Sequence, residues 1–184
     1  MTATESTPLE SPDGPGSPTG TPDAPPANPA PSTIPKVQRP GSSGAPTVVA
    51  AEGAFNRPAS YPDGVVLAIL TAVRAVEEGA GAGAFPGREL VILELELRNG
   101  SAEPINLDQV VITAFYGQSR QLAAPVYAAT TQVRDFSGTV AAGATATARY
   151  AFAIPTSELS AVTMVVDFDD RHGSATFSGS VTVP

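Results

Sequence analysis

The chain has 184 residues and a formal net charge of −8 at pH 7. It contains no Cys, which excludes disulfides, thiolate metal ligands and cysteine catalysis. Its single Lys is Lys36, and its Arg residues form no basic run along the sequence. Because nucleic-acid binding depends on neutralising phosphates with Lys and Arg, we expect no nucleic-acid partner. We also expect no direct membrane insertion, since no stretch of 18 apolar residues occurs.

Residues 1–60 predict a disordered linker rich in Pro, Ser, Thr and Gly. They contain 13 Pro and a single aromatic residue, Phe55, so they offer too little apolar surface to offset the entropy of ordering them. The apolar interruption at 48–55 either docks on the folded part or ends the linker, and the flanking Pro46 and Pro58 favour a linker end. We therefore place the folded domain at residues 61–184.

The first element expected in that domain, 64–76, fits either a helix or a strand. Its apolar residues can be read as a helical stripe, and its alanines support that alternative. The β-branched content and the glycines on both sides favour a strand. One face of this strand would carry Leu67, Ile69, Thr71 and Val73.

Residues 89–98 give the clearest strand pattern in the chain. One face carries only large aliphatic side chains, and the other carries charges; the aliphatic set is Val91, Leu93, Leu95 and Leu97. Such alternation indicates a half-buried strand. Asn99-Gly100 closes it with a turn dipeptide, and Pro104 prevents the ladder from continuing.

Further strands are expected at similar intervals, separated by turn signals. They are 105–116, 121–128, 131–139, 145–154, 161–168 and 174–183. About seven to eight short strands without a long helix predict an all-β fold, an immunoglobulin-like antiparallel β-sandwich. Alternate residues of two of these strands should meet across the core, namely Tyr150, Phe152 and Ile154 with Val162, Met164, Val166 and Phe168.

Two stretches resemble bacterial extracytoplasmic immunoglobulin-like domains of unknown function, which occur in lipoproteins and wall-associated proteins of Gram-positive bacteria. The first is 89–107, in which a strand ends at Asn99-Gly100. The second is 136–155, in which a Gly-centred turn leads into a strand that ends at Pro155. The resemblance covers about residues 64–168. It implies a β-sandwich outside the cytoplasmic membrane, and its motifs are structural, so it implies no activity.

Asp167, Asp169, Asp170 and His172 form the densest cluster of potential metal ligands. Oxygen-rich loops of this kind can hold Ca²⁺, and Asp167 and Asp169 should point to the same side of a strand. No EF-hand spacing or bidentate Glu completes the set. We therefore favour a solvated hairpin tip and expect no metal and no cofactor.

The sequence also contains few residues or motifs that are typical of catalytic sites. His172 is the only His, and no Gly-x-Ser-x-Gly motif presents a nucleophile. Glu94 and Glu96 lie on the polar face of an amphipathic strand beside Arg98, which favours solvated charges over acid–base catalysis. The glycines of 79–83 lack the Lys-Ser/Thr of a phosphate-binding loop. We expect a protein that is not an enzyme.

Two surface features remain. Phe115, Tyr116 and Tyr127 flank the connection 117–125, where they either line a contact surface or pack in the core and at its edges, and we favour packing. Asn99-Gly100-Ser101 matches a glycosylation sequon, and we interpret it as a turn.

These observations predict a non-enzymatic interaction or structural module carried on a flexible spacer, with a protein or cell-envelope partner. The alternative is a protein that binds a small molecule or metal ion through the strand-end loops at 169–172 and 117–125. We expect an extracytoplasmic location from the resemblance. The alternative is the cytoplasm, because the first eight residues have neither a basic n-region nor an apolar h-region.

Overall fold

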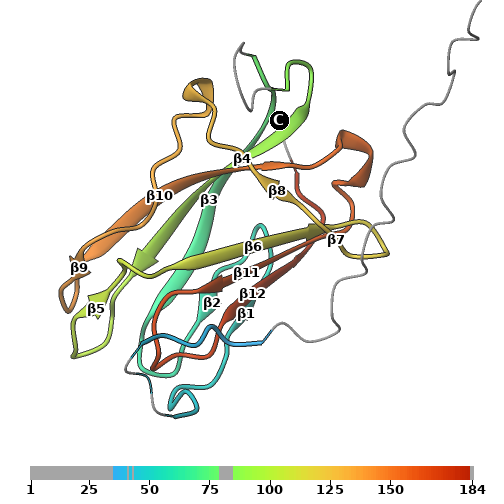
Figure 1. Ribbon diagram of the computed structural model, residues 1–184. Helices are drawn as coiled ribbons and strands as arrows, with labels where there is room; N and C mark the ends of the chain where they lie inside the picture. The colour runs from blue at the N-terminus through green and yellow to red at the C-terminus, as the bar shows by residue number, and fades with distance from the viewer. Residues whose placement is uncertain (1–34, 41, 43, 79–84, 183–184) are drawn as a thin grey trace, which may run out of the picture.

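The computed structural model describes residues 35–40, 42, 44–78 and 85–182, and it is a β-sandwich of two main sheets (Figure 1). This confirms the fold class expected from the sequence. The helical alternative for 64–76 is wrong, because this stretch contains the strand β3 (Val66–Val76). No helix in the described ranges is long and apolar enough to cross a bilayer.

The first sheet has the strand order β1-β12-β11-β6-β7. Its strands are β1 (Glu52–Gly53), β12 (Ala175–Gly179), β11 (Val162–Asp167), β6 (Val111–Tyr116) and β7 (Gln121–Leu122). All neighbours are antiparallel except β1 and β12, which run parallel.

The second sheet has the order β2-β3-β4-β10-β8 and is antiparallel throughout. Its strands are β2 (Ala59–Ser60), β3 (Val66–Val76), β4 (Glu89–Arg98), β10 (Thr145–Ala153) and β8 (Ala124–Pro125). A small pair, β5 (Ile105–Asn106) with β9 (Thr139–Val140), lies at one end of the sandwich (Figure 1). Two short 3-10 helices, η1 (Ala129–Thr131) and η2 (Thr156–Glu158), complete the elements.

The core lies between the two sheets and follows the alternation of the strands. The aliphatic face of β4 is buried as predicted. The alternate residues in and directly after β10 and β11 that were expected to meet are also buried, and all belong to one hydrophobic cluster. Register places Leu93 of β4 beside Tyr150 of β10. Burial of this continuous apolar layer is the main stabilising term of the fold.

A β-bulge in β3 changes which residues face the core. The register against β4 shifts between Ile69 and Thr71, so Leu70 is the extra residue. Leu67 and Ile69 face the core before the bulge, but Ala72 takes that place after it, and Val73 is exposed. The predicted face of β3 is therefore wrong beyond Ile69, since an inserted residue exchanges the two faces of a strand.

The edge of the second sheet is broken beside β10. Pro125 in β8 pairs with Phe152, and Arg134 pairs with Arg149 farther along the same strand, so the chain leaves the ladder between these two points. The excursion includes η1 and packs over the outer face of the sheet, where Val126 joins a second apolar cluster with Leu90, Ile92 and Ala151. The expected continuous strands 121–128 and 131–139 are therefore wrong, and 105–116 is divided into β5 and β6.

The packed structure begins well before Tyr61. Ala51 and Ala59 are buried, β1 and β2 are edge strands of the two sheets, and Val48 forms a parallel bridge with His172. The linker-end interpretation of 48–55 is therefore wrong, and so is the boundary at Tyr61. We call residues 35–40, 42 and 44–53 the strap. The first 34 residues of the linker predicted for 1–60 lie outside the described residues.

Candidate functional site

The predicted ligand cluster lies beneath the strap at one end of the first sheet. Asp167 is 3% exposed and His172 is 1% exposed, so the interpretation as a solvated hairpin tip is wrong for these two residues. Asp169 is partly buried, and Asp170 remains exposed. The structure brings all four together, but around basic groups of the same chain.

Two basic residues of the strap bind the Asp167 carboxylate. Nζ of Lys36 lies 2.5 Å from Oδ1 of Asp167 and also donates to the Asp169 carbonyl. Nη1 of Arg39 donates to the same carboxylate oxygen at 2.7 Å, and its Nη2 donates to the carbonyl oxygens of Asp167 and Gln109. Arg39 is itself buried, so this is an interior ion pair rather than a surface one.

His172 lies between two carboxylates. Its Nδ1 is 2.8 Å from Oδ2 of Asp169, and its Nε2 is 2.9 Å from Oδ2 of Asp63. Each contact is a hydrogen bond when that nitrogen carries a proton. The ring also packs edge-on against Tyr61, whose hydroxyl donates to the Gly173 carbonyl at 2.7 Å. These contacts fix the imidazole on both sides.

Burial and hydrogen bonding oppose each other in setting the acidity of the cluster. Burial alone would raise the pKa of Asp167, but hydrogen bonds from Lys36, the Val37 N–H and Arg39 hold that pKa below its usual value. Asp169 behaves alike, because the side chain and N–H of His172 outweigh its burial and lower its pKa. Burial, reinforced by the carboxylates nearby, raises the pKa of Tyr61, so its hydroxyl stays neutral and donates.

These shifts predict loss of stability in acid. A carboxyl group whose pKa is lower in the folded chain stabilises the fold above its unfolded pKa of about 3.9, and this stabilisation is lost as pH falls through the folded value. We therefore expect the free energy of unfolding of the full chain to decrease as the pH is lowered under about 4. Urea denaturation at a series of pH values measures it.

Carboxyl NMR titration assigns the effect to individual groups. We expect Asp167 and Asp169 to titrate below an exposed aspartate, and Asp170→Asn to leave the acid-induced loss almost unchanged. If Asp167 and Asp169 titrate at ordinary values, the ion pairs do not account for the acid sensitivity.

The carboxylates of the cluster are bound by groups of their own chain, although the buried Nε of Arg39 has no hydrogen-bond partner among the described residues. Among the described residues, no group of three or more His, Asp or Glu side chains is arranged to hold a metal ion. The carboxylates of Asp167 and Asp169 accept hydrogen bonds from Lys36, Arg39, His172 and Ser174. The arrangement therefore serves to hold the strap against the sandwich.

Other residues considered from the sequence also have structural partners. Oε1 of Glu94 forms an ion pair with Nη1 of Arg149 at 2.9 Å, while Glu96 lies on the same outer face of β4. Asn99 is fully buried, and its amide donates to the carbonyl oxygens of Glu103 and Val140. A glycan could not be attached there without breaking these bonds, which supports the interpretation of Asn99-Gly100-Ser101 as a turn.

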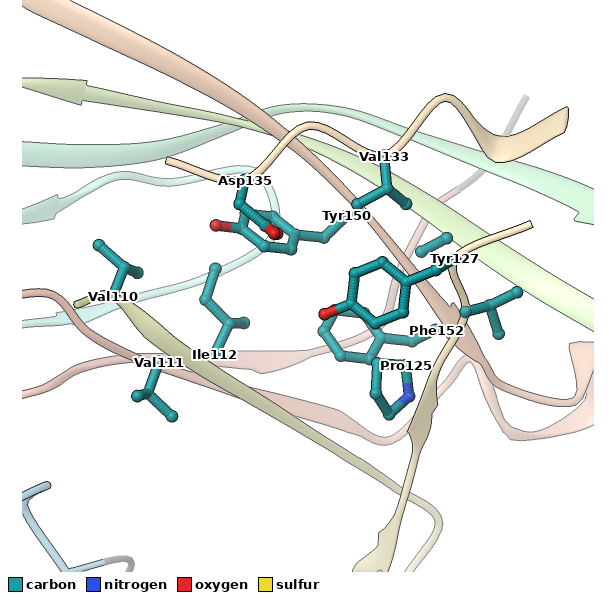
Figure 2. Close-up of a pocket in the computed structure, with 11 residues that line it drawn as sticks. Val110, Val111, Ile112, Pro125, Tyr127, Val133, Asp135, Tyr150 and Phe152 are labelled. Atoms are coloured by element: carbon teal, nitrogen blue, oxygen red, sulfur yellow. The ribbon is translucent and has the colours of Figure 1, made fainter. Parts of the chain in front are cut away.

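An open groove lies between β6 of the first sheet and the broken edge of the second sheet beside β10 (Figure 2). Its volume is about 240 Å³. Here the chain leaves the ladder after β8 and rejoins it at Arg134, beside Tyr150, Ala151 and Phe152 of β10. We call this the Tyr127 groove; its lining residues are Val110, Val111, Ile112, Pro125, Val126, Tyr127, Val133, Asp135, Tyr150, Ala151 and Phe152.

Three aromatic rings and one carboxylate distinguish this groove. Tyr127 is 67% exposed, and its hydroxyl is directed toward the middle of the lining residues, beside Phe152 (Figure 2). The Tyr150 oxygen accepts a hydrogen bond from the Phe136 N–H at 3.0 Å, and burial raises the pKa of Tyr150 to about 12. The Asp135 carboxylate forms no hydrogen bond or ion pair with the described residues.

The sequence identified part of this groove. Tyr127 was considered as a contact residue although packing was favoured, and its exposure contradicts the packing interpretation. Phe115 is buried and Tyr116 packs against the core, as expected. Asp135 and Tyr150 were missed, because only the folded edge of the sheet brings them next to Tyr127.

No protein-family model matches this chain, and no curated protein matches it either. Among solved structures, it is similar to the yjhA protein from Bacillus subtilis, with a TM-score of 0.55 and 13% identity over 68% of this chain and 98% of that one. A second is an uncharacterised β-sandwich protein from Clostridium difficile 630, with a TM-score of 0.41 and 12% identity over 81% of this chain and 99% of that one. A third is a conserved hypothetical protein from Bacillus anthracis, with a TM-score of 0.45 and 12% identity over 71% of this chain and 95% of that one.

Of these three structures, the yjhA protein, with a TM-score of 0.55, supports a conclusion about the fold. Identity of 13% to the yjhA protein carries the fold and nothing finer. Function therefore has to be argued from the side chains of this chain.

Proposed function

We propose that this chain is a non-enzymatic interaction module, an immunoglobulin-like sandwich displayed outside the cytoplasmic membrane on a Pro-rich spacer, and that the Tyr127 groove is its contact surface. The observation that carries the proposal is the open groove with an exposed tyrosine and a carboxylate that has no partner among the described residues. Apolar concavities with a few polar groups are the usual form of binding sites.

The distribution of reactive groups supports a binding role over a catalytic one. The carboxylates and the imidazole best suited to chemistry are already paired: Asp167 binds Lys36 and Arg39 of the strap, and Asp169 binds His172. A general acid or base must reach a substrate, and groups this deeply paired do not. The same pairing argues against the alternative of a metal-ion protein.

The extracytoplasmic part of the proposal rests on sequence. The Pro-rich composition of residues 1–34 suits a spacer, and the motifs around Asn99-Gly100 and Pro155 resemble extracytoplasmic immunoglobulin-like domains of Gram-positive bacteria. Fractionation of cells that express the complete native gene tests this. We expect the protein in the envelope or the medium, and its restriction to the cytosol would remove this part of the proposal.

Site-specific photocrosslinking in the producing cells tests the groove. Tyr127 is replaced by the photoreactive amino acid p-benzoylphenylalanine, and the matched control carries the same replacement at Leu122, which is 63% exposed but outside the groove. After irradiation, intact mass and gel analysis detect adducts of any size. We expect a discrete adduct at position 127 and none at 122. Equal labelling at both positions, or none at either, would contradict the proposed contact surface.

A further inference from the structure

We propose that the occupant of the Tyr127 groove is a small, free organic cation whose nitrogen carries alkyl groups, such as a quaternary ammonium compound. This inference rests on the proposed function, because both require the groove to be a binding surface. It adds the chemical class of the ligand, which follows from the rings, the charge and the walls of the groove.

The aromatic side chains provide the first argument. Tyr127, Tyr150 and Phe152 come from two separate segments and line the same groove (Figure 2). The face of an aromatic ring carries partial negative charge, and cations within about 6 Å of its centre are attracted to it. Quaternary ammonium groups are commonly bound by several such rings together. Tyr127 is 67% exposed, so its ring is accessible to a ligand, whereas Tyr150 and Phe152 are 8% and 3% exposed and form the floor of the groove.

Charge provides the second argument. Asp135 is the one charged residue among those lining the groove, and its carboxylate has no partner in the described part of the chain. The nearest guanidinium along the chain, that of Arg134, is engaged elsewhere, since Nη2 donates to Oγ1 of Thr147 at 3.0 Å. Asp135 is exposed and therefore accessible, so its carboxylate would attract a cationic ligand and repel an anion.

The walls select the kind of cation. Apart from Asp135 and the two phenol groups, the lining residues are aliphatic or Phe152, and their side chains accept no hydrogen bonds. The Tyr150 oxygen already accepts the Phe136 N–H. A primary ammonium has three N–H donors and would leave some of them unsatisfied here, which costs free energy. A tertiary ammonium has one N–H donor and a quaternary ammonium has none, and the alkyl groups of either can pack against the valines.

Size is consistent with a small ligand. The groove has a volume of about 240 Å³, and a cavity of about 150 Å³ is enough for benzene. A trimethylammonium group with a short chain therefore fits, while the polar end of such a molecule remains at the open side of the groove.

Choline and 3,3-dimethylbutan-1-ol form a matched pair of probes, because they have nearly the same shape and differ in charge. Calorimetric and NMR titrations of the full chain measure both. We expect choline to bind at least about ten times more tightly than the neutral alcohol. Asp135→Asn should remove most of this preference, and Tyr127→Ala should weaken both ligands. Glu52→Gln, which removes an exposed carboxylate outside the groove, should change neither.

Three results would overturn the inference. They are equal affinity for choline and the alcohol, a choline affinity unchanged by Asp135→Asn, and absence of choline binding up to a Kd of roughly 10 mM. Tighter binding of n-butylamine than of choline would likewise contradict the alkylated nitrogen. If any of these occurs while crosslinking at position 127 still gives a discrete adduct, the groove remains a contact surface and only the ligand class is wrong.

Discussion

A fragment containing only residues 61–184 is expected to be largely unfolded, whereas a fragment containing 35–184 should be as stable as the full chain. The shorter fragment loses the edge strands β1 and β2 and the buried residues Ala51 and Ala59. It also leaves Asp167 without Lys36 and Arg39. An uncompensated buried charge alone costs about 3–5 kcal/mol, a large share of the roughly 5–15 kcal/mol that stabilises a typical domain.

Circular dichroism and thermal melts of the three chains measure this difference. A pair of glycine substitutions tests the contact between the strap and the sandwich in the full chain. An added Cβ at Gly173 would lie only 2.6 Å from the Ala50 nitrogen, whereas one at Gly138, the control, would meet nothing within 4 Å. Gly173→Ala should therefore lower the melting temperature beyond the effect of Gly138→Ala, whose positive φ alone is a source of strain. Equal melting temperatures for 61–184 and 35–184 would show that the strap is not part of the folding unit.

Arg39→Ala in the full chain is expected to destabilise the fold by about 3–5 kcal/mol. The guanidinium is buried and donates to the Asp167 carboxylate and to the carbonyl oxygens of Asp167, Asp169 and Gln109. Its removal takes one buried, charged donor from each of these acceptors, while Asp167 keeps Lys36, the Val37 N–H and Ser174. Lys36→Ala should cost less, because the Lys36 side chain is more exposed. Urea denaturation of the variants measures the free energies.

Arg74→Ala provides the control, since it removes an exposed guanidinium from β3 and should change stability by less than about 1 kcal/mol. The double variant Arg39→Met with Asp167→Leu separates charge from packing. Replacing both members of a buried ion pair by apolar residues is often nearly neutral, so we expect this variant to be more stable than Arg39→Ala. If Arg39→Ala behaves like Arg74→Ala, the buried ion pair does not hold the strap.

The fold could be predicted from local patterns where one face of a strand is fully buried. In β4 the alternation of Leu and Glu fixed both the strand and its inward face, and Asn99-Gly100 marked its end. The pattern gave the wrong face for the second half of β3. A single extra residue, Leu70, exchanges the inward and outward faces of this strand, and the composition of the segment does not reveal it.

The strap and the site could not be predicted because their partners are distant in the chain. A segment with many prolines looked like a linker, yet Arg39 reaches a carboxylate 128 residues away. Because its partners are so far away in the sequence, Asp167 was interpreted as a solvated charge. At the groove, Tyr127 could be singled out as a flanking aromatic residue, but the break in the edge strand that exposes it depends on pairing with β10.

The hydrogen bond from Arg39 to the Gln109 carbonyl, 3.0 Å long, has a mechanical consequence. Gln109 precedes Val110, which lines the Tyr127 groove. A force that pulls on the chain ahead of Lys36 would enter the sandwich through Lys36 and Arg39, and one of its first points of action is the backbone next to the groove wall. Under the proposed function, tension on the spacer would therefore reach the groove wall through Gln109 and also through Asp167, which pairs with Val111 of the groove.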